Sequence, residues 1–290
     1  MSGEGAVESL GQPIRGPGAL SDDWGRFWHL TYNIARNEFK LRFFGSALGY
    51  VWQLMRPLLL FGVLDIFFTR ITRIGHGGPA EAHYAAQLLG SIVLFTFFAE
   101  ATGGAVRSVV DRENLVRKIQ FPRLVIPVSV VLVALFNLSL NLIVVLIFAL
   151  VAGVRPMLSW LELPLILALL AVFATGVAML LSALFVHFRD VQPIWDVLTQ
   201  VLFYVSPVII PIDSVRERLS HALVQIYMLN PLAVAFQQFR HAMVTHASPS
   251  AAQVIGSQAA LLEPVGIVLA TFVVGFVVFN RSARHIAENL

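Results

Sequence analysis

Long apolar runs, separated by short charged segments, constrain this chain more than any other feature. A membrane-spanning α-helix needs about 20 mostly apolar residues to cross about 30 Å of hydrocarbon. Six runs approach or exceed that length, and we predict spans over 50–69, 85–106, 124–151, 163–186, 193–210 and 264–280. The composition agrees, because 57% of the residues are hydrophobic and only 13% are charged, whereas soluble domains have about 45–50% apolar and about 25% charged residues. The predicted fold class is an all-α membrane protein with six transmembrane helices.

The basic side chains predict the orientation of these spans. If the N-terminus is cytoplasmic, the inner segments hold roughly twice as many Arg and Lys residues as the outer ones, including both lysines, Lys40 and Lys118. We therefore expect a multi-pass protein of the bacterial plasma (inner) membrane, with both termini in the cytoplasm. The net charge of +3 then reflects contacts with membrane lipids, and we expect no nucleic-acid partner.

Several classes of chemistry find no support in the residues. The chain has no cysteine, which excludes disulfides, cysteine-ligated metals and thiol nucleophiles. It has no G-x-x-x-x-G-K-[ST] loop for ATP, and no H-E-x-x-H, G-x-S-x-G or EF-hand motif. His76 and His83 share a glycine-rich loop, where we expect them to be solvated. We predict no catalytic site and no metal in this chain.

Two segments outside the regular spans stand out. Residues 1–21 are rich in Gly and Pro and read as a disordered tail, and 22–44 read as an interfacial amphipathic helix before a 45–290 transmembrane domain. An ordinary cytoplasmic helix is the alternative for 22–44. Between the fifth and sixth spans, about 212–243, Asn230 and Pro231 divide two apolar pieces that are too short to span. We expect re-entrant helices there, with an exposed outer loop as the alternative.

Polar residues near the spans suggest structure rather than proton transport. Asp65 and Glu100 are isolated acids, and a proton relay needs a chain of such groups. Asn137 and Asn141 are one turn apart, and we expect them to hydrogen-bond between helices. A short, highly charged helix is predicted at about 110–122, ended by Pro122. It serves either as a positive-inside anchor or as a docking element for a cytoplasmic partner.

Motifs in order along the chain resemble those of the Wzm and TagG permeases. These are the transmembrane subunits of ABC exporters for O-antigen, teichoic acid and related polysaccharides. The matching segments are 35–42 (ARNEFKLR), 46–52 (SALGYVW), 97–100 (FFAE), 114–123 (NLVRKIQFPR), 187–192 (HFRDVQ), 206–209 (SPVI), 230–231 (NP) and 239–240 (FR). The chain departs from the family at Asn37 and Glu38, where Asp is usual. The Arg-rich, Lys-poor composition is typical of actinobacteria. Within the family that the chain resembles, it favours the mycobacterial galactan exporter, which moves the lipid-linked arabinogalactan precursor.

The resemblance implies a type-2 ABC exporter fold with defined partners. Two copies of this chain would pair with two nucleotide-binding ATPase subunits, which carry the ATP and Mg, and would move a polyprenyl-pyrophosphate-linked polysaccharide. Aromatic residues would line the substrate path, namely Trp52, Phe61, Phe95, Phe98, Phe203 and Tyr204. An outer gate would include Tyr227, Asn230, Pro231 and Phe236. Coupling to the ATPase would use Asn114, Leu115, Arg117, Lys118 and Phe121.

Other interpretations remain open for some of these residues. Arg189 and Asp190 either pair at the inner face near the lipid pyrophosphate or fix the topology. With 22 phenylalanines in the chain, an aromatic residue in a span can equally face lipid or the protein core. For the whole chain, the alternatives are a stand-alone secondary transporter or channel, or a membrane glycosyltransferase. Inverted repeats would favour the first, and a pair of catalytic acids would favour the second.

Overall fold

A computed structural model of the protein describes residues 24–43, 47–67, 83–116, 121–210, 212, 220–244 and 248–283. Within these ranges the chain is helical and contains no strand, which confirms the predicted all-α class. The predicted disordered tail, 1–21, and the predicted coupling residues Arg117 and Lys118 lie outside the described residues.

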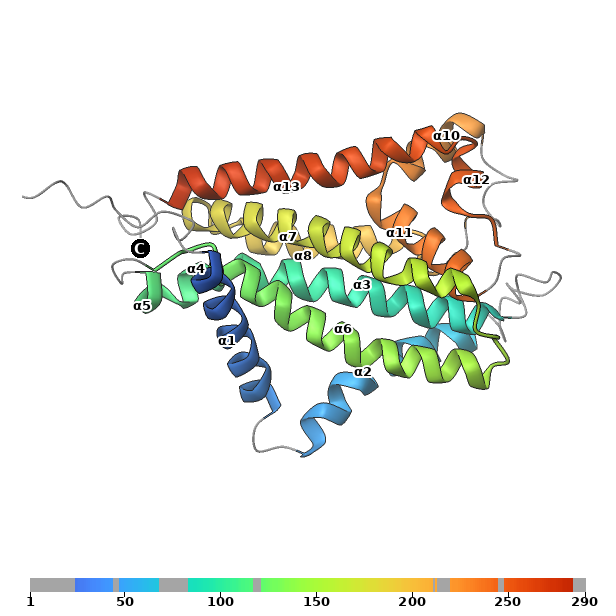
Figure 1. Ribbon diagram of the computed structural model, residues 1–290, viewed down its shortest axis with the longest axis horizontal. Helices are drawn as coiled ribbons and strands as arrows, with labels where there is room; N and C mark the ends of the chain where they lie inside the picture. The colour runs from blue at the N-terminus through green and yellow to red at the C-terminus, as the bar shows by residue number, and fades with distance from the viewer. Residues whose placement is uncertain are drawn as a thin grey trace, which may run out of the picture.

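Four long helices form the body of the protein and run side by side (Figure 1). They are α3 (Tyr84–Val106), α6 (Val125–Val151), α7 (Leu163–His187) and α13 (Leu262–Ala283). Two short 3-10 turns precede the last two of them, η3 (Leu158–Glu162) and η5 (Ala259–Leu261). By length and composition, these four are the described helices that can cross a membrane. They match the predicted spans at 85–106, 124–151, 163–186 and 264–280, so the protein is a multi-pass membrane protein.

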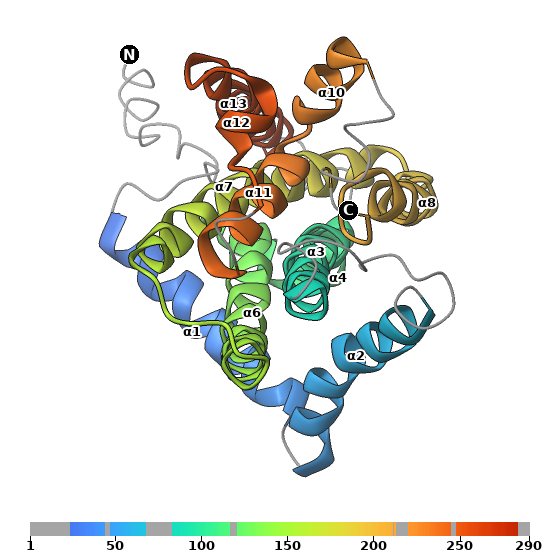
Figure 2. The ribbon, with the colours of Figure 1, turned by 90° about the vertical axis from the view of Figure 1, so that its right-hand side faces the viewer.

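Two further helices lie at the edge of this bundle, α2 (Ala47–Asp65) and α8 (Val191–Val205) (Figure 2). Helix α8 has only 15 residues and none of them is buried. Helix α2 contains Pro57 and Arg56, and most of its residues are exposed or half-buried. Neither helix meets the length and apolarity that mark the other four, so the predicted total of six spans stays a prediction.

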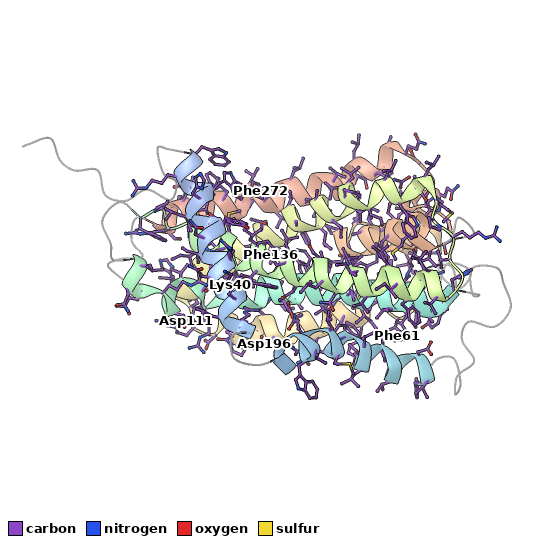
Figure 3. All side chains as sticks on the ribbon, turned by 60° about the horizontal axis from the view of Figure 1, so that its bottom comes forward. Lys40, Phe61, Asp111, Phe136, Asp196 and Phe272 are labelled. Carbon is purple, nitrogen blue, oxygen red and sulfur yellow. The ribbon has the colours of Figure 1, made fainter. Side chains whose placement is uncertain are left out.

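Helix α1 (Trp24–Phe43) crosses one end of α6 at an angle (Figures 1 and 3). One face is buried, with Phe27, Thr31 and Ala35 each at most 2% exposed. The ring of Phe136 on α6 meets Phe39 edge to face, with centroids 5.6 Å apart. The opposite face is polar and exposed, with Arg26, Asn33 and Lys40, so α1 is amphipathic, and exposed rings such as Trp28 lie beside the buried face. Its position at a membrane interface stays a prediction.

Helices α7 and α13 touch backbone to backbone at two glycines. A Cβ atom added at Gly275 would overlap the carbonyl oxygen of Gly176. A Cβ added at Gly176 would lie 2.7 Å from the Phe272 backbone. Because only glycine lets two helix backbones approach this closely, the pair defines a fixed crossing point between the two helices.

Short helices cap both ends of the bundle. One end carries α4 (Ser108–Asp111) and α5 (Glu113–Val116). The other carries α10 (His221–Met228), α11 (Pro231–Phe239), the π-helical turn η4 (Arg240–Val244) and α12 (Ala251–Ile255). Asn230 caps α11, because its Oδ1 accepts a hydrogen bond from Leu232 N at 3.0 Å, and Pro231 occupies the first turn. The predicted break at Asn230 and Pro231 is therefore confirmed, whereas the re-entrant position of these helices stays a prediction.

Candidate functional site

Half of the predicted path aromatics, Phe95, Phe98 and Phe203, meet in one cluster between α3, α7 and α8. Phe95 and Phe203 meet edge to face with centroids 5.0 Å apart. Phe98 stacks on Phe173 of α7 at 5.5 Å and lies 6.2 Å from Trp195 of α8. Phe95 and Phe98 are buried within the protomer, at 6% and 1% exposure. These rings hold α8 against the bundle, and the two phenylalanines of α3 present little surface to a ligand.

The other predicted path residues lie at the edge of the protomer. Tyr204 on α8 is 76% exposed, and Trp52 on α2 is 63% exposed. Phe61 is half-buried and pairs with Phe148 of α6 at 5.3 Å, on the side of α2 that faces the bundle. The structure therefore leaves Trp52 and Tyr204 accessible, on the two helices that are least buried.

Helix α8 also carries a polar stripe. Asp196 and Gln200 are exposed, and with Tyr204 they recur at every fourth residue, so the three lie on one face of the helix. Figure 3 shows Asp196 on the side of the molecule where α2 also lies. A charged side chain is costly in lipid. In a membrane, this face of α8 must therefore meet water, a polar ligand or another protein surface.

A polar junction joins three helices around Glu100. Its Oε1 accepts a hydrogen bond from Gln53 Nε2 of α2, and its Oε2 accepts one from Asn137 Nδ2 of α6, both at 3.0 Å. Asn141 Nδ2 donates to the carbonyl oxygen of Asn137 within α6, at 2.9 Å. The predicted interhelical role is confirmed for Asn137, whereas Asn141 bonds within its own helix. Gln53 could be found only from the structure, because an isolated Gln carries no spacing signal.

At the α4–α5 end, Arg112 connects three elements. Its Nη2 forms an ion pair with Glu38 of α1. Its Nη1 donates to Ser129 Oγ at 3.3 Å and to the Ile126 carbonyl oxygen at 3.4 Å, both on α6. The two charged side chains are only 17% and 29% exposed. Arg112 therefore ties the amphipathic helix α1 to the turn between α4 and α5.

The predicted coupling residues lie beside this contact. Asn114 is exposed, and Leu115 and Phe121 are half-buried. Arg123 follows them and is only 2% exposed, and its Nε and Nη1 have no hydrogen-bond partner among the described residues. Burial lowers the pKa of the Arg123 guanidinium from its usual value. Arg189 lies over the Phe185 ring at 5.1 Å, and no ion pair joins it to Asp190 in the described part of the chain.

At the α10–α12 end, a buried cation holds the predicted gate helices. The Arg240 side chain is 1% exposed. Its Nε donates to Ser91 Oγ of α3 at 3.2 Å, and its Nη2 donates to the carbonyl oxygens of Pro207 and of Val208, the latter at 2.9 Å. Asn230 Nδ2 donates to Ser206 Oγ at 3.1 Å. Helices α10 and α11 are thus bound to the segment that follows α8.

The other predicted gate residues lie at the same end of the bundle, in and around α10 and α11. Phe236 is fully buried, Tyr227 and Pro231 are half-buried, and Tyr227 packs against the cluster around Met228 and Val254. Among the described residues, no group of three His, Asp or Glu side chains comes together as a metal site. Over the described residues, the candidate site is a set of helix faces and end caps.

Comparison with known proteins finds relatives that are all named for transport or export. A family model described as "ABC-2 type transporter" matches residues 29–244. An O-antigen export system permease protein RfbA of Klebsiella pneumoniae is 27% identical over 267 residues, covering 92% of this chain and 96% of the relative. The RfbA protein of Myxococcus xanthus is 26% identical, over 77% of this chain and 83% of the relative. The polysialic acid transport protein KpsM of Escherichia coli is 21% identical, over 71% and 78%.

Proposed function

Because the chain belongs to the ABC-2 type transporter family, we propose that it is the transmembrane subunit of an ATP-driven exporter of lipid-linked polysaccharide. The observation that carries this proposal is the similarity along nearly the whole chain to permeases named for O-antigen export. The relative named for polysialic acid transport supports the same substrate class. A lipid-linked galactan is the member of that class that we propose to test first.

In the proposed topology, α2 and α8 are the remaining two of six crossings. At about 1.5 Å per residue, the 19 residues of α2 reach about 28 Å and the 15 residues of α8 about 22 Å. The α4–α5 end, with Arg107, Arg112 and Lys40 nearby, faces the cytoplasm under the positive-inside rule. Helices α10 and α11 then approach the membrane from the outside, as an outer gate that includes Tyr227, Asn230, Pro231 and Phe236.

A second copy would complete the substrate path. The polar stripe of Asp196, Gln200 and Tyr204 needs a polar environment, and the exposed faces of α2 and α8 are free to pair around a two-fold axis. Sugar rings would stack on the accessible rings of Trp52 and Tyr204. The predicted path residues Phe61, Phe95, Phe98 and Phe203 would support these two helices from behind.

Two ATPase subunits, which carry ATP and Mg, would drive the cycle from the cytoplasmic side. Helix α5 (Glu113–Val116) lies at the α4–α5 end, where a docking element is expected, and includes the exposed Asn114. The contact between Arg112 and Glu38 gives that element a direct connection to α1. A movement of the docked ATPase would therefore reach α1 and α6 together.

Co-purification with the ATPase encoded beside this chain tests the proposal. The tagged permease and that ATPase are co-expressed, purified in mild detergent and assayed for stoichiometry and ATP hydrolysis. An ATPase lacking its catalytic residue is the control. We expect a complex of equal copies that hydrolyses ATP and, in vesicles, moves a lipid-linked galactan. A permease that elutes alone under every nucleotide condition would instead support a stand-alone transporter or channel.

A further inference from the structure

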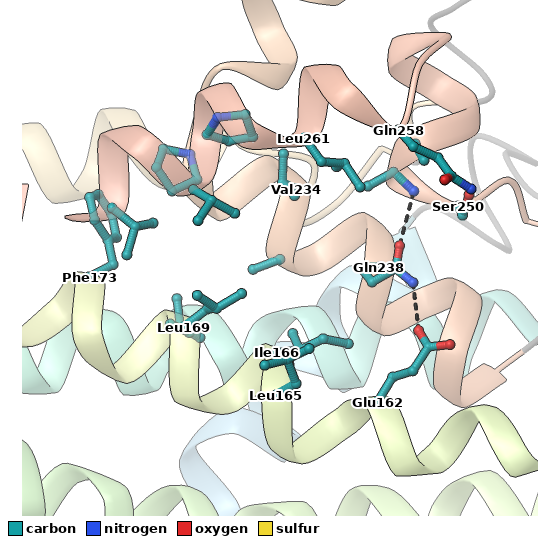
Figure 4. Close-up of a pocket in the computed structure, with 18 residues that line it drawn as sticks. Glu162, Leu165, Ile166, Leu169, Phe173, Val234, Gln238, Ser250, Gln258 and Leu261 are labelled. Carbon is teal, nitrogen blue, oxygen red and sulfur yellow. Dashed lines mark hydrogen bonds between the residues drawn. The ribbon is translucent and has the colours of Figure 1, made fainter. Parts of the chain in front are cut away.

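An apolar groove lies between α7, α11, α12 and α13, at the α10–α12 end of the bundle (Figure 4). Its volume is about 470 Å³, which falls within the range of about 300–1,000 Å³ for ligand pockets. Leu165, Leu169 and Phe173 of α7 form one wall, Val268 of α13 contributes to the opposite wall, and Val234 of α11 lies between them. The groove is separate from the faces of α2 and α8 to which the substrate path is assigned.

The crossing point of α7 and α13 explains why the groove exists. The two backbones touch at Gly176 and Gly275, and toward the other end α11 lies between the two helices (Figure 1). The groove occupies the space between that glycine contact and α12. Its depth along α7, from Leu165 to Phe173, is about 12 Å at about 1.5 Å per residue. One leaflet contributes about 15 Å of hydrocarbon, so the groove covers most of one leaflet.

One end of the groove is polar and carries a negative charge. Gln238 Nε2 donates to Glu162 Oε2 at 2.7 Å, and Gln238 Oε1 accepts from Ala251 N at 3.1 Å. Gln258 and Ser250 lie on the same side (Figure 4). Glu162 is the one charged residue in the lining, and no Lys or Arg lines the groove. The second carboxylate oxygen of Glu162 is available to a donor.

We propose that this groove binds one acyl chain of a membrane phospholipid whose headgroup carries an ammonium group. The groove opens between two membrane-spanning helices, beside residues such as Leu165 and Leu269 that are 64% and 53% exposed and face hydrocarbon. An acyl chain is therefore the apolar group that surrounds its opening. The carboxylate of Glu162 selects the headgroup, because it attracts an ammonium and repels a headgroup with net negative charge. The site follows from the membrane fold and does not depend on the proposed polysaccharide.

Lipid titration of the full-length protein tests this site. The protein is purified, stripped of lipid and titrated with palmitoyl-oleoyl phosphatidylethanolamine or with the matched phosphatidylglycerol, and bound lipid is counted by native mass spectrometry. Ala235→Phe fills the groove from α11, and Ala168→Phe adds the same ring on the exposed face of α7, outside the groove. Glu162→Gln removes the charge and keeps an acceptor for Gln238.

We expect the wild type and Ala168→Phe to bind one phosphatidylethanolamine in preference to phosphatidylglycerol. Ala235→Phe should weaken that binding by at least about tenfold, or about 1.4 kcal/mol. Glu162→Gln should reduce the headgroup preference roughly two- to fivefold, the range of an exposed ion pair. Added phosphatidylethanolamine should raise the unfolding temperature of the wild type but not of Ala235→Phe. If Ala235→Phe does not fold, Val265→Phe fills the same space from α13.

Three results would overturn the proposal. One is equal lipid binding by the wild type and a folded groove-filling variant. Another is a wild-type preference for phosphatidylglycerol or for neither lipid. The third is displacement of the bound lipid by a polyprenyl phosphate at equal concentration, which would assign the groove to the carrier of the exported glycan. Failure of ATPase association would contradict the proposed function and leave these lipid results unchanged.

Discussion

At the residue scale, buried polar side chains within the bundle bond to amide groups and backbone carbonyls, and two arginines at its ends, Arg123 and Arg240, are buried. Glu100 accepts from two amide groups on neighbouring helices. Arg240 donates to Ser91 and to backbone carbonyl oxygens. Such hydrogen bonds orient helices in a medium where apolar contacts are shared with lipid. Glu100 therefore determines how α2 sits on α3 and α6.

We predict that Glu100→Ala lowers the stability of the purified protein by about 1–2 kcal/mol, because two interhelical hydrogen bonds are lost. Glu100→Gln keeps one acceptor oxygen and should lose about half of that. Thermal unfolding in detergent measures both changes. Glu263→Ala, at the exposed start of α13, is the matched control. An unchanged unfolding temperature for Glu100→Ala would show that the junction contributes nothing to stability.

The ion pair between Arg112 and Glu38 allows a prediction about coupling. Because both side chains are partly exposed, breaking the pair should change stability by only about 0–1 kcal/mol. Glu38→Ala should nevertheless uncouple ATP hydrolysis from export, since α1 loses its polar contact with the α4–α5 turn. Hydrolysis and transport are measured together in vesicles that contain the complex. A charge exchange, Glu38→Arg with Arg112→Glu, should restore coupling, and equal coupling in all variants would contradict this role.

At the element scale, the helices of this protein pack in two different ways. Helices α3 and α6 meet through side chains, as in the hydrogen bond from Asn137 to Glu100, whereas α7 and α13 touch backbone to backbone at Gly176 and Gly275. Close contact at one point lets α7 and α13 hold each other with little side-chain burial in α13. The same point leaves room for α11 between them at one end.

Gly275→Ala should therefore force α7 and α13 apart and destabilise the protein by about 1–3 kcal/mol, as overpacking does. Gly266→Ala, on the same helix, meets no atom within 4 Å and should stabilise by up to about 1 kcal/mol through the helix propensity of alanine. The difference between the two unfolding temperatures is the measurement. Equal values would show that the contact relaxes freely.

The sequence predicts the elements better than it predicts their contacts. The long spans are evident because an uninterrupted apolar run such as 124–151 can satisfy its backbone hydrogen bonds in lipid only as a helix. The Gly176–Gly275 contact was not predicted, because it joins residues far apart in the chain and glycine has no side chain to reveal a partner. Phe98 and Tyr204 were predicted to share a path, yet one is buried and the other exposed. Among so many phenylalanines, no periodicity separates these two environments.

At the scale of the whole molecule, two sides of the protomer expose different kinds of side chain. Helices α2 and α8 expose polar and aromatic residues, among them Asp196, Tyr204 and Trp52, together with aliphatic ones, whereas the exposed large side chains of α13 are aliphatic, such as Leu269. We expect the α13 side to contact lipid, because its exposed side chains are apolar. We expect the α2–α8 side to contact a second copy of the chain, because it carries charged and polar side chains. The proposed dimer therefore has a defined face.

The absence of native cysteine makes this face testable with single substitutions. Tyr204→Cys should form an oxidant-dependent dimer in membranes, because the residue lies near the proposed two-fold axis. Leu269→Cys, on the opposite side, should stay monomeric under the same treatment. Gel mobility without reductant records both. Crosslinking through Leu269→Cys alone would place the dimer contact on α13.

The crossing of α7 and α13 also gives α13 a pivot at Gly275, so that moving one end of this helix moves the other end in the opposite direction. The arm from 262 to 275 is about 20 Å long, and the arm from 275 to 283 is about 12 Å. The short arm carries Phe279, which is buried in one cluster with Phe27 of α1 and Val109 of α4. If the groove widened by about 3 Å at the long arm, the end that carries Phe279 would move about 2 Å in the opposite direction, because the two arms differ in length by this ratio. A lipid bound in the groove in one leaflet would thus change the distance between α13 and helices α1 and α4 at the opposite end of the bundle, where the ATPase is proposed to dock.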